Sequence, residues 1–129
     1  MSLFLSGLSA YSDWGLLILR IVIGAIFLYH CQMKFKYLPS PFGFLGIAEL
    51  LGGIAMIVGF LTPLAATGLG IVMLGAIYMK TIVWNVPFSA MDKTGWELDS
   101  MILAGCIALL LFGAGAYSAD ASIFAASVY

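Results

Sequence analysis

Residues 43–84 read GFLGIAELLGGIAMIVGFLTPLAATGLGIVMLGAIYMKTIVW, and this stretch decides the fold. It carries only two charged residues, and the apolar runs on either side of Thr62-Pro63 are each long enough to cross a bilayer, which takes about 20 residues. Proline is tolerated at a helix start because its missing N–H would be unpaired there anyway. The stretch therefore predicts two spanning helices, 43–61 and 63–84, joined as an antiparallel hairpin.

Two further apolar stretches flank this hairpin, at 14–35 and 96–114, and proline-containing loops separate them from it. Because every backbone polar group in lipid needs an internal partner, such segments must be helices. Four helices with short loops most simply form an up-down bundle. We therefore expect an all-α integral membrane protein, a single domain over residues 1–129 that ends in a short interfacial tail.

The composition of the whole chain agrees with a membrane environment. Hydrophobic residues make up 64% of it and charged residues 9%, and the mean hydropathy is +1.14, whereas a soluble domain carries about 25% charged residues. The net charge is −1 and no basic run occurs, so nucleic acid is not an expected partner. The two cysteines, Cys31 and Cys106, lie in different spans without CxxC spacing, which favours packed thiols over a disulfide.

The distribution of lysines predicts the orientation in the membrane. Lys34, Lys36 and Lys93 lie in or beside the first and third loops, and Lys80 is near the same face. By the positive-inside rule these loops are cytoplasmic, so both termini of this multi-pass protein of the cell membrane lie outside. No Lys or Arg precedes Arg20, so a cleaved secretory signal is not expected.

Aromatic residues at both ends of the predicted spans support these boundaries, since tyrosine and tryptophan collect at membrane interfaces. They are Tyr11, Trp14 and Tyr117 at the outer end, and Tyr37, Trp84 and Trp96 at the inner end.

Ionisable side chains inside spans are rare and usually functional. At about 1.5 Å per residue, His30 and Glu49 lie about 8 and 9 Å from the inner helix ends, Lys80 about 6 Å and Glu97 within about 3 Å. Four helices thus bring polar groups to one level, which predicts a polar cluster of His30, Glu49, Lys80 and Glu97. Asp99 points away from Glu97 on the same helix, so we expect only one of them, Glu97, to face the bundle.

Two uses of this cluster are open. His30 beside Glu49 would form a titratable pair, which suits a proton relay or a hydrogen bond to a quinone carbonyl. The same groups would equally serve as a structural network that fixes the register of the helices. No metal-ligand spacing, hydrolytic triad or glycine-rich phosphate loop occurs, so the sequence predicts neither a metal site nor catalytic residues, and quinone is the one cofactor suggested.

Arg20 lies about 9 Å from the opposite end of its span, more than about 10 Å in depth from Glu49, which disfavours an ion pair between them. Its long side chain would either extend to the outer headgroups or contact an anionic headgroup or substrate.

Residues along most of the chain resemble, in order, those of the DoxX family. They are Leu19-Arg20, Gly24, Phe27, Tyr29-His30 and Lys34; Glu49-Leu-Leu-Gly-Gly53; Gly59 to Thr62 with Ala65-Ala66; Gly95-Trp-Glu97; and Gly113-Ala-Gly115 with Tyr117-Ser118 and Asp120. The chain departs from the family pattern at Cys31-Gln32, where members often have a glycine and a further polar or aromatic residue, and at Ala116, where a basic residue is common.

The resemblance implies a four-helix inner-membrane protein but not by itself an enzyme, so whether this chain is an enzyme stays open. Some members of this family are linked to thiosulfate:quinone oxidoreductase, others to redox-stress membrane assemblies, and distant eukaryotic ones to receptor assembly. We expect a non-catalytic accessory or assembly subunit of a larger membrane complex. Its partners would be the bilayer and other membrane chains or further copies of itself. The alternative is a quinone-interacting subunit of an oxidoreductase; a small transporter is a weaker reading, because no inverted repeat is evident.

Overall fold

The computed structural model describes residues 1–124, except for the side chains of Ser2, Phe4 and Leu5. All regular elements in this range are helical, which confirms the predicted all-α class. Residues 125–129 of the predicted C-terminal tail lie outside the described part.

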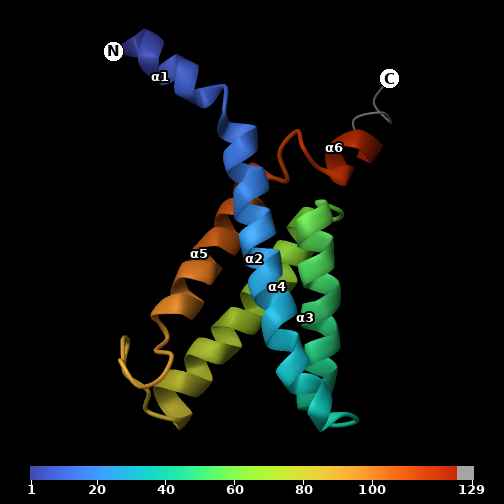
Figure 1. Ribbon diagram of the computed structural model, residues 1–129, viewed down its shortest axis with the longest axis vertical. Coiled ribbons are helices and arrows are strands. Elements are labelled where there is room, and N and C mark those ends of the chain that lie inside the picture. Colours follow the sequence, from blue (N-terminus) through green and yellow to red (C-terminus); the bar gives the residue numbers. More distant parts are fainter. Residues whose placement is uncertain (125–129) are drawn as a thin grey trace.

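The helices follow one another along the chain, with short connections except for the long loop between Val83 and Glu97 (Figure 1). They are α1 (Ser2–Ser9), α2 (Ser12–Lys34), the 3₁₀ turn η1 (Phe35–Tyr37), α3 (Pro41–Val58), α4 (Thr62–Tyr78), the π-turn η2 (Met79–Val83), α5 (Glu97–Phe112) and α6 (Ala119–Phe124). The short helices α1 and α6 were not predicted.

Three stretches are long and apolar enough to cross a membrane: α2 with η1, α3, and α4 with η2. They correspond to the first three predicted spans. The fourth, α5, has 16 residues and a length of about 24 Å, less than the roughly 30 Å hydrocarbon core of a bilayer. Three helices are thus candidate membrane spans by length and composition, and the complete four-helix up-down bundle stays a prediction.

The ends of α3 follow from local chemistry. Pro41 occupies the first turn, and the Ser40 hydroxyl accepts a hydrogen bond from the Gly43 N–H at 3.3 Å, which caps the N-terminus. At the other end Gly59 adopts φ +74°, the left-handed conformation that terminates helices and that glycine adopts without strain. Ser40 and Pro41 thus set the start of α3, and Gly59 ends it before α4 begins.

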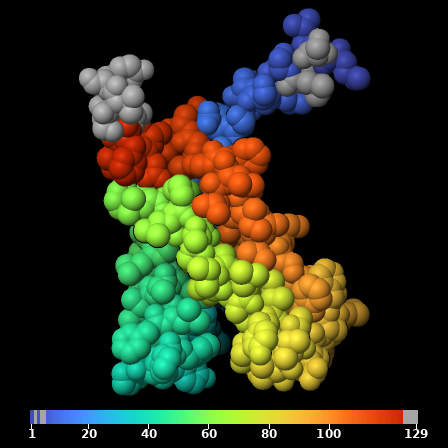
Figure 2. Space-filling model, turned by 180° about the vertical axis from the view of Figure 1, so that it is seen from behind, coloured from blue at the N-terminus to red at the C-terminus, as the bar shows by residue number. Residues whose placement is uncertain are grey.

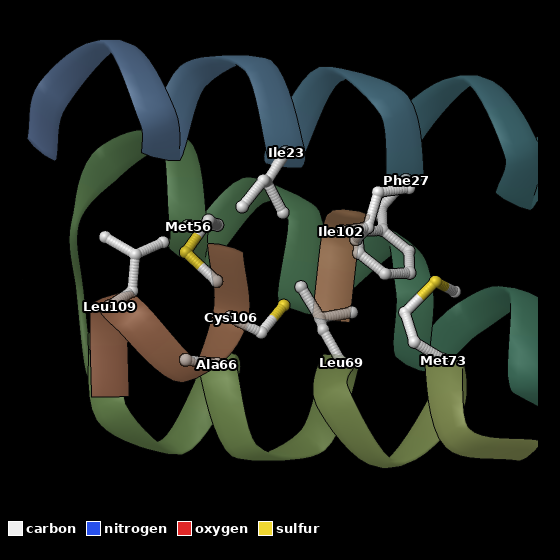
Figure 3. Close-up of a cluster of buried hydrophobic side chains, with 9 residues drawn as sticks. All are labelled: Ile23, Phe27, Met56, Ala66, Leu69, Met73, Ile102, Cys106 and Leu109. Atoms are coloured by element: carbon white, nitrogen blue, oxygen red, sulfur yellow. The ribbon is translucent and has the colours of Figure 1, made fainter. Parts of the chain in front are cut away.

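One apolar core joins the helices (Figure 3). Ile23 and Phe27 of α2 meet residues from the three other long helices: Met56 of α3; Ala66, Leu69 and Met73 of α4; and Ile102, Cys106 and Leu109 of α5. In lipid this contact is favoured by close packing rather than by exclusion of water. The cysteines are buried free thiols, as expected.

Glycines bring α2 and α3 into backbone contact. A Cβ atom added to Gly24 would lie 2.6 Å from the Gly53 carbonyl oxygen, and one added to Gly53 would lie 3.0 Å from the Gly24 oxygen. Gly52, one residue away, faces Leu69 of α4 instead. Small residues therefore let α3 approach a neighbour on two sides.

The molecule forms two hairpins, α2–α3 and α4–α5, that meet at one end and diverge at the other (Figure 1). Figure 2 shows the diverging ends of the two hairpins at the bottom of the view, with an open gap between them. We call this the lysine end, formed by residues 30–49 and 78–99. The opposite end, formed by residues 12–20, 59–62 and 113–120, is the tail end.

Replacing Gly53 with leucine should destabilise the protein, because the new side chain meets the α2 backbone. Such overpacking typically costs about 1–3 kcal/mol. The measurement is the midpoint of unfolding by SDS in mixed micelles, followed by circular dichroism. Gly75→Leu in α4 is the matched control, since nothing lies within 4 Å of a Cβ added there. Equal midpoints for the two variants would show that the glycine contact does not hold the hairpin.

Candidate functional site

On each long helix, the row of residues that faces the core continues into polar residues at the lysine end. Along α2, Ile23 and Phe27 are followed by His30 and Lys34 at spacings of three and four residues, so all four share one face. The core-facing stripes of α3, α4 and α5 continue in the same direction to Glu49, Lys80 and Asp99 respectively. These five polar residues form the candidate site.

Glu49 pairs with Lys34 across the α2–α3 seam. The carboxylate is 1% exposed, and its Oε1 accepts a hydrogen bond from the Lys34 ammonium, which also lies 5.5 Å from the centre of the Phe42 ring. Gly46 makes room for Lys34, because an added Cβ would lie 2.8 Å from the Lys34 Cβ. Oε2 of Glu49 is buried and has no hydrogen-bond partner within the described residues.

A second ion pair joins α5 to the end of α4. Lys80 and Asp99 approach to 2.6 Å, and both side chains are largely buried. Lys80 belongs to the π-turn η2, and its ammonium also donates to the Gly95 carbonyl at 3.3 Å. Each hairpin thus contains one lysine–carboxylate pair near its diverging end.

His30 lies exposed beyond the core. Its ring makes an edge contact with the adjacent Tyr29 ring, with centroids 5.6 Å apart, and the predicted pair with Glu49 does not form because Lys34 takes that place. The core covers Phe27, one turn earlier on the same stripe. We attribute the exposure of His30 to the divergence of the hairpins, which removes the covering helices at this level (Figure 2).

The two acids of α5 take the reverse of the expected positions. Asp99 is buried and Glu97 is exposed, whereas we expected Glu97 to face the bundle. The reason is helix phase, since Asp99 lies three and seven residues before Ile102 and Cys106, which both face the core. Glu97 opens the helix, where its charge favourably meets the helix dipole.

The predicted cluster of four is therefore divided in the structure. Glu49 and Lys80 belong to separate ion pairs, while His30 and Glu97 are exposed and lie outside both. A functional role for these residues remains a prediction. Lys34 was missed as a site residue, although its position on the His30 stripe would have indicated it.

Arg20 is fully buried at the tail end, so it does not extend to the headgroups. Its Nη1 donates to the Met56 and Ile57 carbonyls at 3.3 and 3.2 Å, and its Nη2 donates to the Tyr117 carbonyl. The two α3 carbonyls lie at the helix C-terminus, where the dipole attracts a cation. The predicted contact with an anionic headgroup remains a prediction, but these donors already have partners within the chain.

Residues after α5 complete the tail end. The Asp120 carboxylate accepts hydrogen bonds from the Leu61 and Thr62 N–H groups at 2.6 and 2.8 Å, and so caps α4 from a distant part of the chain. The Asp120 N–H donates to the Gly59 carbonyl at 2.8 Å. A Cβ added to Gly59 would collide with the Arg20 guanidinium and would lie 2.5 Å from the Ser118 Cβ, so only glycine fits there.

Most charged groups of the spans therefore have partners within the chain, which suits mechanical bracing of the helices. In lipid such pairing removes the cost of isolated charge. At the lysine end, the exposed His30 ring and the Oε2 atom of Glu49, which has no hydrogen-bond partner in the described part of the chain, remain available to a ligand.

Comparison with protein families gives one match, to the DoxX family model over residues 38–82. The predicted resemblance to this family is confirmed for that range, which contains α3, α4 and most of η2 with Glu49 and Lys80. No curated protein and no solved structure matches the chain.

Replacing Arg20 with methionine should lower stability by about 3 kcal/mol or more, because three buried carbonyls lose a charged donor and each such bond contributes about 1.5–3 kcal/mol. Arg20→Lys should recover part of the loss, since an ammonium reaches fewer of these carbonyls. SDS unfolding in mixed micelles measures both. Lys36→Met removes an exposed cation and should change little. A methionine variant as stable as the wild type would contradict the role of Arg20.

Proposed function

We propose that this chain is a non-catalytic accessory or assembly subunit of a larger membrane complex of the respiratory or redox type. The observation that carries the proposal is the internal pairing of its membrane charges. Arg20 is bound by backbone carbonyls, and Glu49 and Asp99 by lysines. Charges used in this way stabilise a scaffold rather than process a substrate.

The proposal includes four membrane crossings in an up-down arrangement. α5 alone is short, but Gly95-Trp96 before it and residues 113–117 after it are apolar or aromatic and would extend its reach across a bilayer. The lysine end contains Lys34, Lys36, Lys80 and Lys93, and the positive-inside rule places this end on the cytoplasmic side. Both termini then lie on the outer, non-cytoplasmic side of the membrane.

A groove on the outer face of α3 and α4 offers a place for a helix of another chain. It has a volume of about 430 Å³, and small residues line much of it, namely Ala48, Gly52, Ala55, Ala65 and Gly68. Small side chains permit close approach of helices in lipid. We therefore assign the contact with the larger complex to this groove.

The test is purification of the tagged chain from its own host in mild detergent, followed by native mass spectrometry. A stoichiometric partner chain should accompany the wild type, and Gly68→Leu should abolish it by filling the groove. Gly75→Leu is the control; like Gly68 it has open space around an added Cβ, but it does not line the groove. A homogeneous 13.8 kDa monomer throughout would refute the accessory role. Assemblies of this chain alone would replace that role with self-association.

The exposure of His30 favours a second candidate, a quinone-interacting subunit of an oxidoreductase. His30 is exposed at the lysine end, where an imidazole N–H would donate to a quinone carbonyl. The carboxylate–lysine pairs near the same end would supply a polar surrounding. Quinone would bind there as a ligand, while the electron donor would lie on another chain.

For this candidate we expect the wild type to retain added ubiquinone or menaquinone through gel filtration in detergent. His30→Leu should reduce retention at least several-fold, because the donor is lost, while His30→Gln keeps an N–H donor and should retain more. The control is Gln32→Leu, which removes an exposed polar side chain of the same helix. Equal retention by His30→Leu and the wild type would exclude a role of His30 in quinone binding.

A further inference from the structure

A second groove lies at the tail end, between the first turns of α2 and the end of α5. Its volume is about 520 Å³, and its lining includes Asp13, Gly15, Leu16, Leu19, Phe112 and Gly115. It is distinct from the lysine-end site and from the α3–α4 groove. The inference drawn from it is independent of the proposed function.

The groove changes from polar to apolar with depth in the membrane. Asp13 is the second residue of α2, beside Trp14, whose ring packs against the Tyr117 ring at a centroid distance of 4.7 Å. Aromatic side chains of this kind mark the headgroup level. Leu19 lies about 9 Å deeper along the helix. The lining therefore suits an amphiphile, with its head at Asp13 and its chain along Leu16 and Leu19.

The charge at the head of the groove has no counter-charge in the described part of the chain. Oδ1 of Asp13 accepts a hydrogen bond from the Ala116 N–H at 2.9 Å, and neither ion pair of the structure includes Asp13. Arg20, the one cationic side chain of the tail end within residues 1–124, is bound by carbonyls, so it does not neutralise this carboxylate. The second oxygen, Oδ2, remains for a cationic ligand.

We propose that this groove binds a phospholipid with a primary-amine headgroup, of the phosphatidylethanolamine type. Its ammonium donates to Asp13, and one acyl chain lies over Leu16, Leu19 and Phe112. A primary ammonium is preferred to a quaternary one because only the former has N–H donors for the carboxylate. The anionic phosphatidylglycerol headgroup has no amine and is repelled by Asp13.

The space at Gly15 provides a way to close the groove. Nothing lies within 4 Å of a Cβ added there, although Gly15 lines the groove, so a larger side chain extends into the groove rather than into the protein. Leucine is also a better helix former than glycine, so Gly15→Leu should fold.

The experiment is native mass spectrometry of the detergent-solubilised protein after exchange into an equimolar mixture of phosphatidylethanolamine, phosphatidylcholine and phosphatidylglycerol with identical acyl chains. The wild type should retain the ethanolamine lipid at least about threefold over each of the others. Asp13→Asn should abolish this preference, because it removes the charge but keeps an oxygen for the Ala116 N–H. Gly15→Leu should lower total lipid retention, whereas Gly75→Leu should leave both preference and retention unchanged.

Equal retention of the three lipids by the wild type would overturn the proposal. So would an ethanolamine preference that survives Asp13→Asn. A preference shared by the choline lipid would refute the requirement for N–H donors. Circular dichroism of each variant verifies its fold. If Asp13→Asn does not fold, the ethanolamine preference of the wild type and the lower retention of the ethanolamine lipid by Gly15→Leu decide the question.

Discussion

The fold at the tail end depends on one buried cation. The guanidinium of Arg20 donates hydrogen bonds to the Met56 and Ile57 carbonyls near the end of α3, which have no partner within the helix. It also donates to the Tyr117 carbonyl, 97 residues further along the chain. A buried charge in such surroundings is costly unless it has partners, and here three carbonyl oxygens bind Nη1 and Nη2. Gly59 must therefore have no side chain, and the segment after α5 must return to this point. The meeting of the two hairpins follows from this requirement.

At the opposite end the same problem of buried charge is solved differently. Each hairpin has its own lysine–carboxylate pair, so neither needs the other to satisfy its charges there. Removing one member of such a pair would be costly, because the remaining charge would be unpaired. The two hairpins can consequently separate at the lysine end, as they do in Figure 1, without isolating a charge. The hairpins are thus joined at the tail end and separate at the lysine end, where a gap remains between them (Figure 2).

The sequence predicted the helices better than the site, for physical reasons. Proline and glycine set the boundaries of α3 and α4 locally. The observed helices therefore begin, at Pro41 and Thr62, within a few residues of the predicted starts at 43 and 63. Inward-facing residues depend on helix phase, where one position moves a side chain by about 100°, and this explains Asp99 in place of Glu97. The partners of Arg20 are backbone carbonyls, which leave no signal in a side-chain pattern. The membrane orientation and the functional roles remain predictions.

The return of the C-terminal segment has a consequence for biosynthesis. Arg20 emerges from the ribosome 97 residues before Tyr117, so for that interval a nascent chain holds Arg20 in the α2 span with an incomplete set of acceptors. Until the late residues arrive, that span is poorly suited to lipid and the tail end stays open. A truncated or stalled product would expose this arginine in the membrane. By recognising this exposed arginine, a membrane quality-control protease would distinguish unfinished chains from finished ones.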